Sequence, residues 1–132
     1  MPSQAKSYSV SNSPFQVQRG PSRLIVANDL VRYEWTLASA GFPAAICFAD
    51  TRDSVANLTL RASVRGRGIV RPHLSNFAPE IVKSGDALVV TFPRIDWTDA
   101  RGAQLPGYRL SLQYELHPDG AVFVTTFFFT ET

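Results

Sequence analysis

Residues 106–132, PGYRLSLQYELHPDGAVFVTTFFFTET, carry the clearest structural pattern in this chain. Over Tyr108–His117 apolar and polar residues alternate, and a period of two places each set on its own face of a β-strand. Pro118-Asp119-Gly120 follows as a turn, because proline fixes φ and glycine accepts a positive φ. The chain can then return through Ala121–Phe129 as a second strand. This stretch therefore predicts a long C-terminal β-hairpin.

Further segments show strand-like alternation or a short apolar run. They are Leu24–Ala27, Val31–Leu37, Ala44–Ala49, Asn57–Val64 and Ala87–Phe92. Asn28 and Asp29 tolerate left-handed backbone geometry, which predicts a second hairpin around them. Residues 65–80 show no regular alternation of apolar and polar residues, which indicates a functional loop or an unrecognised strand. Pro93 is expected to end the preceding strand or to leave it at a sheet edge. Residues 95–106 are then expected to form a connection. Short strands without a helical period predict an all-β protein, built as a single antiparallel β-sandwich or a sandwich-like barrel.

Length and composition fit one folded domain. The chain has 132 residues, of which 45% are hydrophobic, enough for a single core and too few for two ordinary domains. Residues 1–14 are rich in serine and asparagine, so we expect a mobile N-terminal arm there and a single antiparallel β domain over residues 15–132. Cys47 is the only cysteine, so no internal disulfide can form and stability must come from the core.

Charge and hydropathy narrow the classes of partner. Thirteen Lys and Arg against eleven Asp and Glu leave a formal charge of +2, too small to indicate a nucleic acid or an anionic membrane. No stretch approaches the ~20 apolar residues of a membrane helix, and residues 1–6 lack the apolar centre of a secretory signal. We therefore expect no membrane association. The sequence as given indicates a cytoplasmic location, although a removed signal peptide would leave the same pattern.

One segment combines an aromatic ring with charged groups. Asp96, Trp97 and Asp99 lie close together in the sequence, and Arg101 follows two residues later. Carbohydrate sites use this mixture, since an aromatic ring stacks on the apolar face of a sugar and charged groups hydrogen-bond to its hydroxyls. These four residues form the candidate ligand-binding set. The alternative is a tryptophan that closes one end of the core, because tryptophan in small domains is usually structural.

Arginines gather beside glycines in the middle of the chain. Arg65, Arg67 and Arg71 form a candidate anion-binding set, because neighbouring glycines let a backbone approach a phosphate or a carboxylate. The alternative is a solvated loop, since no aromatic residues are interleaved as single-strand binders require. His73 and His117 are the only histidines, and the sequence indicates neither a metal site nor a cofactor.

A likeness to a known group rests on strand pattern and turn residues. The segments that carry it are the hairpin Leu24–Leu37, the break Gly41-Phe42-Pro43, the strand Leu88–Phe92, and Leu105–Tyr108 followed by Tyr114–Val124. Together they resemble the supersandwich domains of the galactose-mutarotase-like group, which precede the catalytic domain in many glycoside hydrolases. The resemblance implies a carbohydrate context, in which the chain binds a sugar or packs against a catalytic domain. The histidines and glutamate that enzymatic mutarotases use have no matching positions here, so the resemblance implies no catalytic residue.

The last predicted strand is apolar on both faces. Phe127, Phe128 and Phe129 are consecutive, so their side chains alternate between the two faces of a sheet. A strand of this kind requires cover on both sides, and at a sheet edge it invites pairing with another chain. We therefore expect the strand to be central in its sheet or to join a partner chain. The three phenylalanines are candidate interface residues.

The sequence leads to three functional hypotheses. The first is a non-catalytic β-sandwich module in a carbohydrate context. The second is a structural or oligomerising protein, such as a shell or coat-like subunit, in which residues 1–14 reach a neighbour. The third is a small enzyme that uses Glu34, Asp50, Asp53 or Arg67 in a barrel mouth. Because no arrangement of nucleophile, base or metal ligands stands out, binding or assembly is favoured over catalysis.

Overall fold

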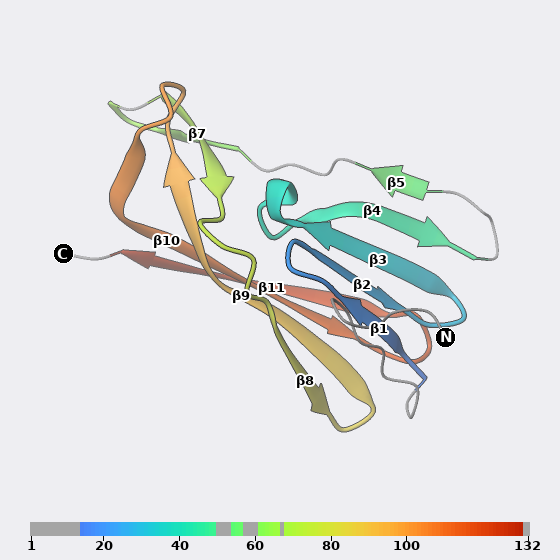
Figure 1. Cartoon of the computed structure of the whole chain (residues 1–132). Coiled ribbons are helices and arrows are strands. Elements are labelled where there is room, and N and C mark those ends of the chain that lie inside the picture. Colours follow the sequence, from blue (N-terminus) through green and yellow to red (C-terminus); the bar gives the residue numbers. More distant parts are fainter. Residues whose placement is uncertain (1–13, 50–53, 57–60, 67, 131–132) are drawn as a thin grey trace.

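Two antiparallel sheets make up the fold (Figure 1). The structure is a computed structural model that describes residues 14–49, 54–56, 61–66 and 68–130. Within these ranges the chain forms eleven β-strands and one short 3-10 helix. The prediction of an all-β antiparallel sandwich is confirmed. The predicted N-terminal arm lies almost wholly outside the described residues, and the first buried side chain is that of Phe15.

The first sheet contains five strands that follow one another in sequence order. They are β1 (Gln16–Arg19), β2 (Arg23–Ala27), β3 (Val31–Thr36), β4 (Pro43–Phe48) and β5 (Ser54–Ala56). The predicted hairpin of β2 and β3 is confirmed, with Leu24 opposite Trp35. Between them Asn28 Oδ1 accepts backbone hydrogen bonds from Leu30 at 2.8 Å and Val31 at 2.9 Å. The 3-10 helix η1 (Leu37–Ser39) then leads from β3 towards β4.

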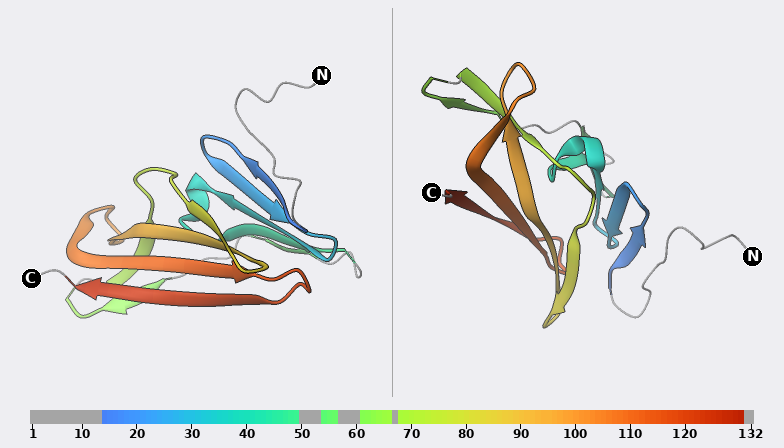
Figure 2. Two further views of the ribbon diagram at one scale, coloured as in Figure 1. Left: turned by 90° about the horizontal axis from the view of Figure 1, so that it is seen from below. Right: turned by 60° about the vertical axis from the view of Figure 1, so that its left-hand side comes forward.

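The second sheet contains the remaining six strands. They are β6 (Ala62–Val64), β7 (Gly68–His73), β8 (Glu80–Ser84), β9 (Ala87–Thr98), β10 (Gln104–Leu116) and β11 (Val122–Thr130). The strand order is β11-β10-β9-β7-β6, and β8 also pairs with β9. Because β10 takes one side of β9, β7 and β8 follow each other along its other side. Figure 2 shows β9 and β10 as the long, curved strands of this sheet.

In the middle of the chain, one open alternative is decided and one expectation is corrected. Residues 65–80 contain β7, so that region includes an unrecognised strand. The strand expected to end near Pro93 continues to Thr98, and Asp96 and Trp97 therefore lie in β9 and not on a loop. The pairing of β9 with β10 shifts register between Phe92 and Ile95, which places Pro93 in the irregular part of the ladder. A proline lacks the N–H of a regular ladder, and an irregularity accommodates it.

The C-terminal hairpin forms as predicted. β10 and β11 pair from Tyr108 opposite Thr130 to Leu116 opposite Val122. The turn closes with two backbone hydrogen bonds, at 2.9 Å from the His117 N–H to the Ala121 carbonyl and at 3.0 Å from the Gly120 N–H to the His117 carbonyl. This hairpin supplies one border of the second sheet.

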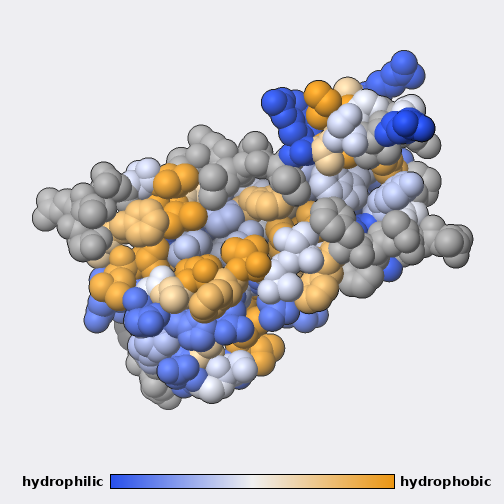
Figure 3. Space-filling view, turned by 180° about the vertical axis from the view of Figure 1, so that it is seen from behind, coloured by the Kyte–Doolittle hydropathy of each residue, from blue (hydrophilic) through white to orange (hydrophobic). Residues whose placement is uncertain are grey.

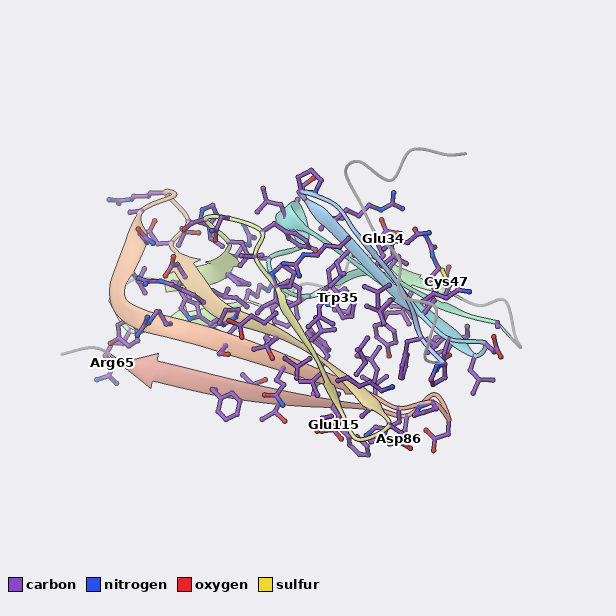
Figure 4. The ribbon with its side chains drawn as sticks, turned by 60° about the horizontal axis from the view of Figure 1, so that its bottom comes forward. Glu34, Trp35, Cys47, Arg65, Asp86 and Glu115 are labelled. Carbon is purple, nitrogen blue, oxygen red and sulfur yellow. The ribbon has the colours of Figure 1, made fainter. Side chains whose placement is uncertain are left out.

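The core lies between the sheets and centres on Trp35. Its side chain is 0% exposed. Its ring centroid lies 5.2 Å from that of Tyr114 and 6.0 Å from that of Phe92, both on the second sheet. Figure 4 shows Trp35 between the two layers, whereas Glu34, its neighbour on β3, lies on the outer side of the first sheet. The alternation of β3 thus separates the core from the solvent-facing surface.

A buried hydrogen bond joins the two layers. The Tyr114 hydroxyl on β10 donates to the carbonyl oxygen of Gly41, between η1 and β4, at 2.7 Å. Burial raises the pKa of Tyr114 far above its ordinary value of 10.0, because a phenolate would lose its hydration there. Gly41 has a φ of +85°, and a Cβ at this position would lie 2.6 Å from Cδ1 of Ile95. Glycine therefore fits this crossing point where a larger residue does not.

Candidate functional site

β11 forms one border of the second sheet. Among the described residues it pairs only with β10, so one side of its nine-residue backbone faces no other strand. The left view of Figure 2 shows β11, in red, running beside β10 at this border. The expectation that the strand is central is wrong, because β9 takes the other side of β10 and β11 ends the sheet. Its pairing with a partner chain stays a prediction.

Large apolar side chains are exposed along this border. Phe123 is 59% exposed, Val124 56% and Phe127 45%. Phe123 and Phe127 lie opposite Glu115 and Ser111 of β10, on the face that points away from the core. The side chains of Phe128 and Phe129 lie outside what the structure describes. Figure 3 shows the molecule from behind, with apolar side chains gathered across the middle of the view and hydrophilic ones around them.

The composition of β11 differs from that of the other border strands. From Val122 to Thr130 it contains no charged residue. By contrast, β8 carries Glu80 and Lys83, and β1 carries Arg19. The borders β5 and β6 are three residues long each. Short length and charged side chains are means by which proteins prevent edge pairing, and among the described border strands β11 alone has neither.

Contacts between the two hairpin turns position the start of β11. The side-chain amide of Asn28, between β2 and β3, donates to the carbonyl oxygen of His117 at 3.2 Å. The His117 ring lies edge-on to the Phe123 ring, with centroids 5.4 Å apart. Nε2 of His117 lies 2.6 Å from Oε2 of Glu115 on β10. The first residues of β11 are thus fixed to the sandwich, so the open edge is preformed.

The predicted ligand-binding residues do not form one exposed surface. Trp97 is 4% exposed and belongs to the core, in agreement with its structural interpretation. Asp96 is 7% exposed, accepts a hydrogen bond from the Ser75 hydroxyl at 3.3 Å and lies 3.7 Å from Nε of Arg94. In this structure the Trp97 ring offers no open face on which a sugar could stack.

The other two members of that set belong to the turn between β9 and β10. Oδ1 of Asp99 accepts backbone hydrogen bonds from Arg101 and Ala103, both at 2.9 Å. The Arg101 side chain is exposed. Asp99 therefore organises its own turn, and the assignment of the four residues to a ligand stays a prediction.

The predicted anion-binding arginines are only partly described. Arg65 is exposed in the turn between β6 and β7, and Arg71 is exposed on β7 opposite Thr98. Arg67 lies outside the described residues. Figure 4 shows Arg65 at the opposite end of the second sheet from Glu115. The anion site stays a prediction.

Of the four residues proposed for a small enzyme, the structure describes Glu34 alone. Glu34 lies on the outer face of the first sheet, 2.7 Å from Nε of Arg23 and 3.6 Å from Nη2 of Arg32. Asp50 and Asp53 lie outside the described residues, as does Arg67. Glu34 thus takes part in surface ion pairs with Arg23 and Arg32, and pairs of this kind in general contribute little to stability.

A hollow that the sequence did not reveal opens between the first sheet and β7. It has a volume of about 560 Å³ and is lined by Ser22, Arg23, Thr36, Leu37, Ala38, Ala40, Pro72, His73 and Leu74. Its two charged or titratable members, Arg23 and His73, are exposed, and most of the lining is apolar. No period in the sequence could have signalled it, because it forms only where two separate sheets meet.

Two further features, a metal-ligand cluster and a membrane-spanning helix, are absent from the described residues. Within the part of the chain that the structure describes, no group of three or more His, Cys, Asp or Glu could hold a metal ion. In the same residues no helix has both the length and the apolar character needed to cross a bilayer.

Fold and site together define a two-sheet antiparallel β-sandwich with one open, uncharged border strand. No protein-family model matches the chain, and no significant match was found among curated proteins or among solved structures. The function must therefore be argued from the geometry of the molecule.

Proposed function

We propose that the protein is a non-catalytic β-sandwich module that acts by self-association, as a structural or oligomerising protein whose interface is β11. The observation that supports this most is a nine-residue border strand without a charged residue. A strand at a sheet edge presents unpaired N–H and C=O groups, and another strand can pair with them. The same contact would cover the exposed side chains of Phe123, Val124 and Phe127.

The strength expected of this association follows from its size. Covering apolar surface stabilises a complex by roughly 25 cal/mol per Å². A single pair of strands covers less than the about 1,600 Å² of a standard stable interface, and association also costs translational and side-chain entropy. We therefore expect a reversible association that depends on protein concentration.

Two matched substitutions test the proposal. Val124 on β11 and Val82 on β8 are both border residues, 56% and 59% exposed. Val124→Lys places a charge on the proposed interface, whereas Val82→Lys places the same charge on a border that already carries Glu80 and Lys83. Light scattering over a range of concentrations should show association of the native chain and of Val82→Lys, and a monomer for Val124→Lys.

The outcomes are distinct. A native chain that stays monomeric up to millimolar concentration overturns the proposal, and so does equal association of the two variants. Circular dichroism of each variant checks that the sandwich has folded, so loss of association is not mistaken for loss of structure.

The carbohydrate-module hypothesis is the weaker of the two. Its stacking residue Trp97 is buried, and the hollow between the sheets has no Trp, Tyr or Phe in its lining. The carbohydrate-module hypothesis also has a second version, in which the chain packs against a catalytic domain. In that version the catalytic domain, and not a second copy of the chain, would cover the β11 edge. A native chain that does not self-associate but binds immobilised glycans would favour it over self-association.

A further inference from the structure

We infer that the hollow between the first sheet and β7 binds a small aliphatic molecule that carries one carboxylate. The inference does not depend on self-association, because β9 and β10 separate β7 from β11 in the second sheet. Three features of the described residues support it: the size and apolar character of the hollow, the ordered wall on its first-sheet side, and the charge that Arg23 brings to its lining.

The size and lining of the hollow suit an aliphatic ligand. Its volume of about 560 Å³ lies within the roughly 300–1,000 Å³ of small-molecule pockets. Figure 1 shows the teal coil of η1, which forms part of one wall, beside the end of β7, which forms the other. Leucine, alanine and proline supply most of the described lining, which contains no aromatic ring, and Leu37 is 38% exposed. An aliphatic chain in the hollow would remove this apolar surface from water.

Hydrogen bonds order the wall that η1 forms. Thr36 Oγ1 accepts from the Ser39 N–H at 3.2 Å, and Ser39 Oγ accepts from the Thr36 N–H at 3.0 Å. The Leu37 N–H donates to the Ser22 carbonyl at 3.0 Å, which ties η1 to the beginning of β2. Because this wall is already ordered, a ligand would bind without the entropic cost of fixing a loop.

The same wall contains a strained residue. Ala40 has a φ of +56°, and among the described residues it is the only residue other than glycine with a positive φ. A Cβ makes the left-handed conformation unfavourable, and residues held in it are concentrated at functional sites. The strain at Ala40 therefore agrees with a binding role for the hollow.

Arg23 makes the hollow suitable for an anion. Its Nε donates to Oε2 of Glu34 at 2.7 Å, and Nη2 of Arg32 lies 3.6 Å from Oε1 of the same carboxylate. One negative charge thus faces two guanidinium groups, and no Asp or Glu occurs in the described lining. The bond to Glu34 uses one of the five N–H donors of Arg23, and guanidinium groups bind carboxylates through paired hydrogen bonds. A carboxylate at the end of an aliphatic ligand would meet this excess of positive charge.

Octanoate, an aliphatic chain that ends in one carboxylate, is the probe. Nuclear magnetic resonance follows the backbone amides of the full chain as octanoate is added up to about 10 mM. We expect saturable shifts at Leu37, Ala38 and His73, with an affinity in the millimolar range because the ligand is small. Octanamide, which has the same chain without the charge, should bind more weakly.

Two arginine variants test the role of charge. Arg23→Gln and Arg32→Gln each remove a guanidinium from Glu34, but only Arg23 lines the hollow. Arg23→Gln should weaken octanoate binding roughly fivefold to tenfold, because charge-assisted hydrogen bonds are lost. Arg32→Gln should change it by less than about twofold, since exposed charges farther from the ligand are screened.

Two alanine variants test the location. Ala38→Trp should fill the hollow and abolish octanoate binding, whereas Ala103→Trp, at an exposed position in the turn between β9 and β10, should leave it unchanged. Circular dichroism checks that each variant is folded. Shifts that are missing at the hollow or confined to β11 overturn the site, as does equal binding by the two alanine variants. Equal binding of octanamide and octanoate, or equal effects of the two arginine substitutions, overturns the assignment of a carboxylate.

Discussion

Gly41 is the residue on which the crossing between the two sheets depends. Its φ of +85° is costly for any residue with a Cβ, and that atom would also lie 2.6 Å from Cδ1 of Ile95. Gly85 is a matched control, since its φ is +61° but nothing lies within 4 Å of its would-be Cβ. We expect Gly85→Ala to lose about 1–2 kcal/mol through backbone strain alone.

Gly41→Ala should lose about 1–3 kcal/mol more than Gly85→Ala, because it adds overpacking to the same strain. Urea unfolding of both variants measures the difference. Equal losses would show that Ile95 moves aside without cost, and that the close approach at Gly41 is not a constraint.

Tyr114 links the stability of the sandwich to pH. Burial raises its folded pKa above the ordinary value of 10.0, so the folded state keeps the phenolic proton when the unfolded state begins to lose it. The contribution is fully present below pH 10.0 and is lost as pH rises from there towards the folded pKa. Burial also raises the pKa of Tyr33, which adds to the same slope.

Substitution Tyr114→Phe should therefore have two effects. At neutral pH it removes the hydrogen bond to the Gly41 carbonyl and should cost about 1–3 kcal/mol, because a buried acceptor is left unsatisfied. Above pH 10 it should flatten the fall of stability with pH without abolishing it, since Tyr33 remains. Denaturant midpoints across the alkaline range measure both, and an unchanged slope would contradict the role assigned to Tyr114.

Asn28 connects the turns of two hairpins. Its Oδ1 accepts from Leu30 and Val31 within the turn between β2 and β3, while its amide donates to the His117 carbonyl at 3.2 Å. Asn28→Ala loses both functions and should cost about 2–3 kcal/mol. Asn28→Asp keeps the acceptor and loses only the donor, so we expect a smaller loss.

Equilibrium unfolding distinguishes these cases. If Asn28→Asp were as stable as the native chain, the hydrogen bond between the two hairpin turns would contribute nothing. If it were as unstable as Asn28→Ala, the turn itself would not depend on the Oδ1 acceptor.

Strands in which apolar and polar residues alternate with a period of two could be predicted from the sequence. Features that depend on the register between two paired strands could not. The alternation over Tyr108–His117 predicted β10, and Asn28 predicted the hairpin of β2 and β3. The continuation of β9 past Pro93 was missed, because the register shift that accommodates the proline depends on the pairing with β10. A local sequence pattern contains no information on that partner.

The same limit applied to the candidate sites. Trp97 and its acidic neighbours form a group in the sequence. Because side chains alternate between the two faces of β9, the Trp97 side chain lies in the core, and the residue is only 4% exposed. The three consecutive phenylalanines of β11 correctly marked an unusual strand. The sequence could not say whether that strand lies at a border or in the middle, since this depends on the order of strands far apart in the chain.

In the whole molecule, we expect association to take place at the border of the second sheet that β11 forms. Hydrogen exchange, followed strand by strand at low and high protein concentration, measures this most directly. Amides on the open side of β11 should exchange more slowly as concentration rises, because a second copy then binds them, while the amides of β8 should not change. Exchange in β11 that is independent of concentration would contradict the claim that this edge is where the protein associates.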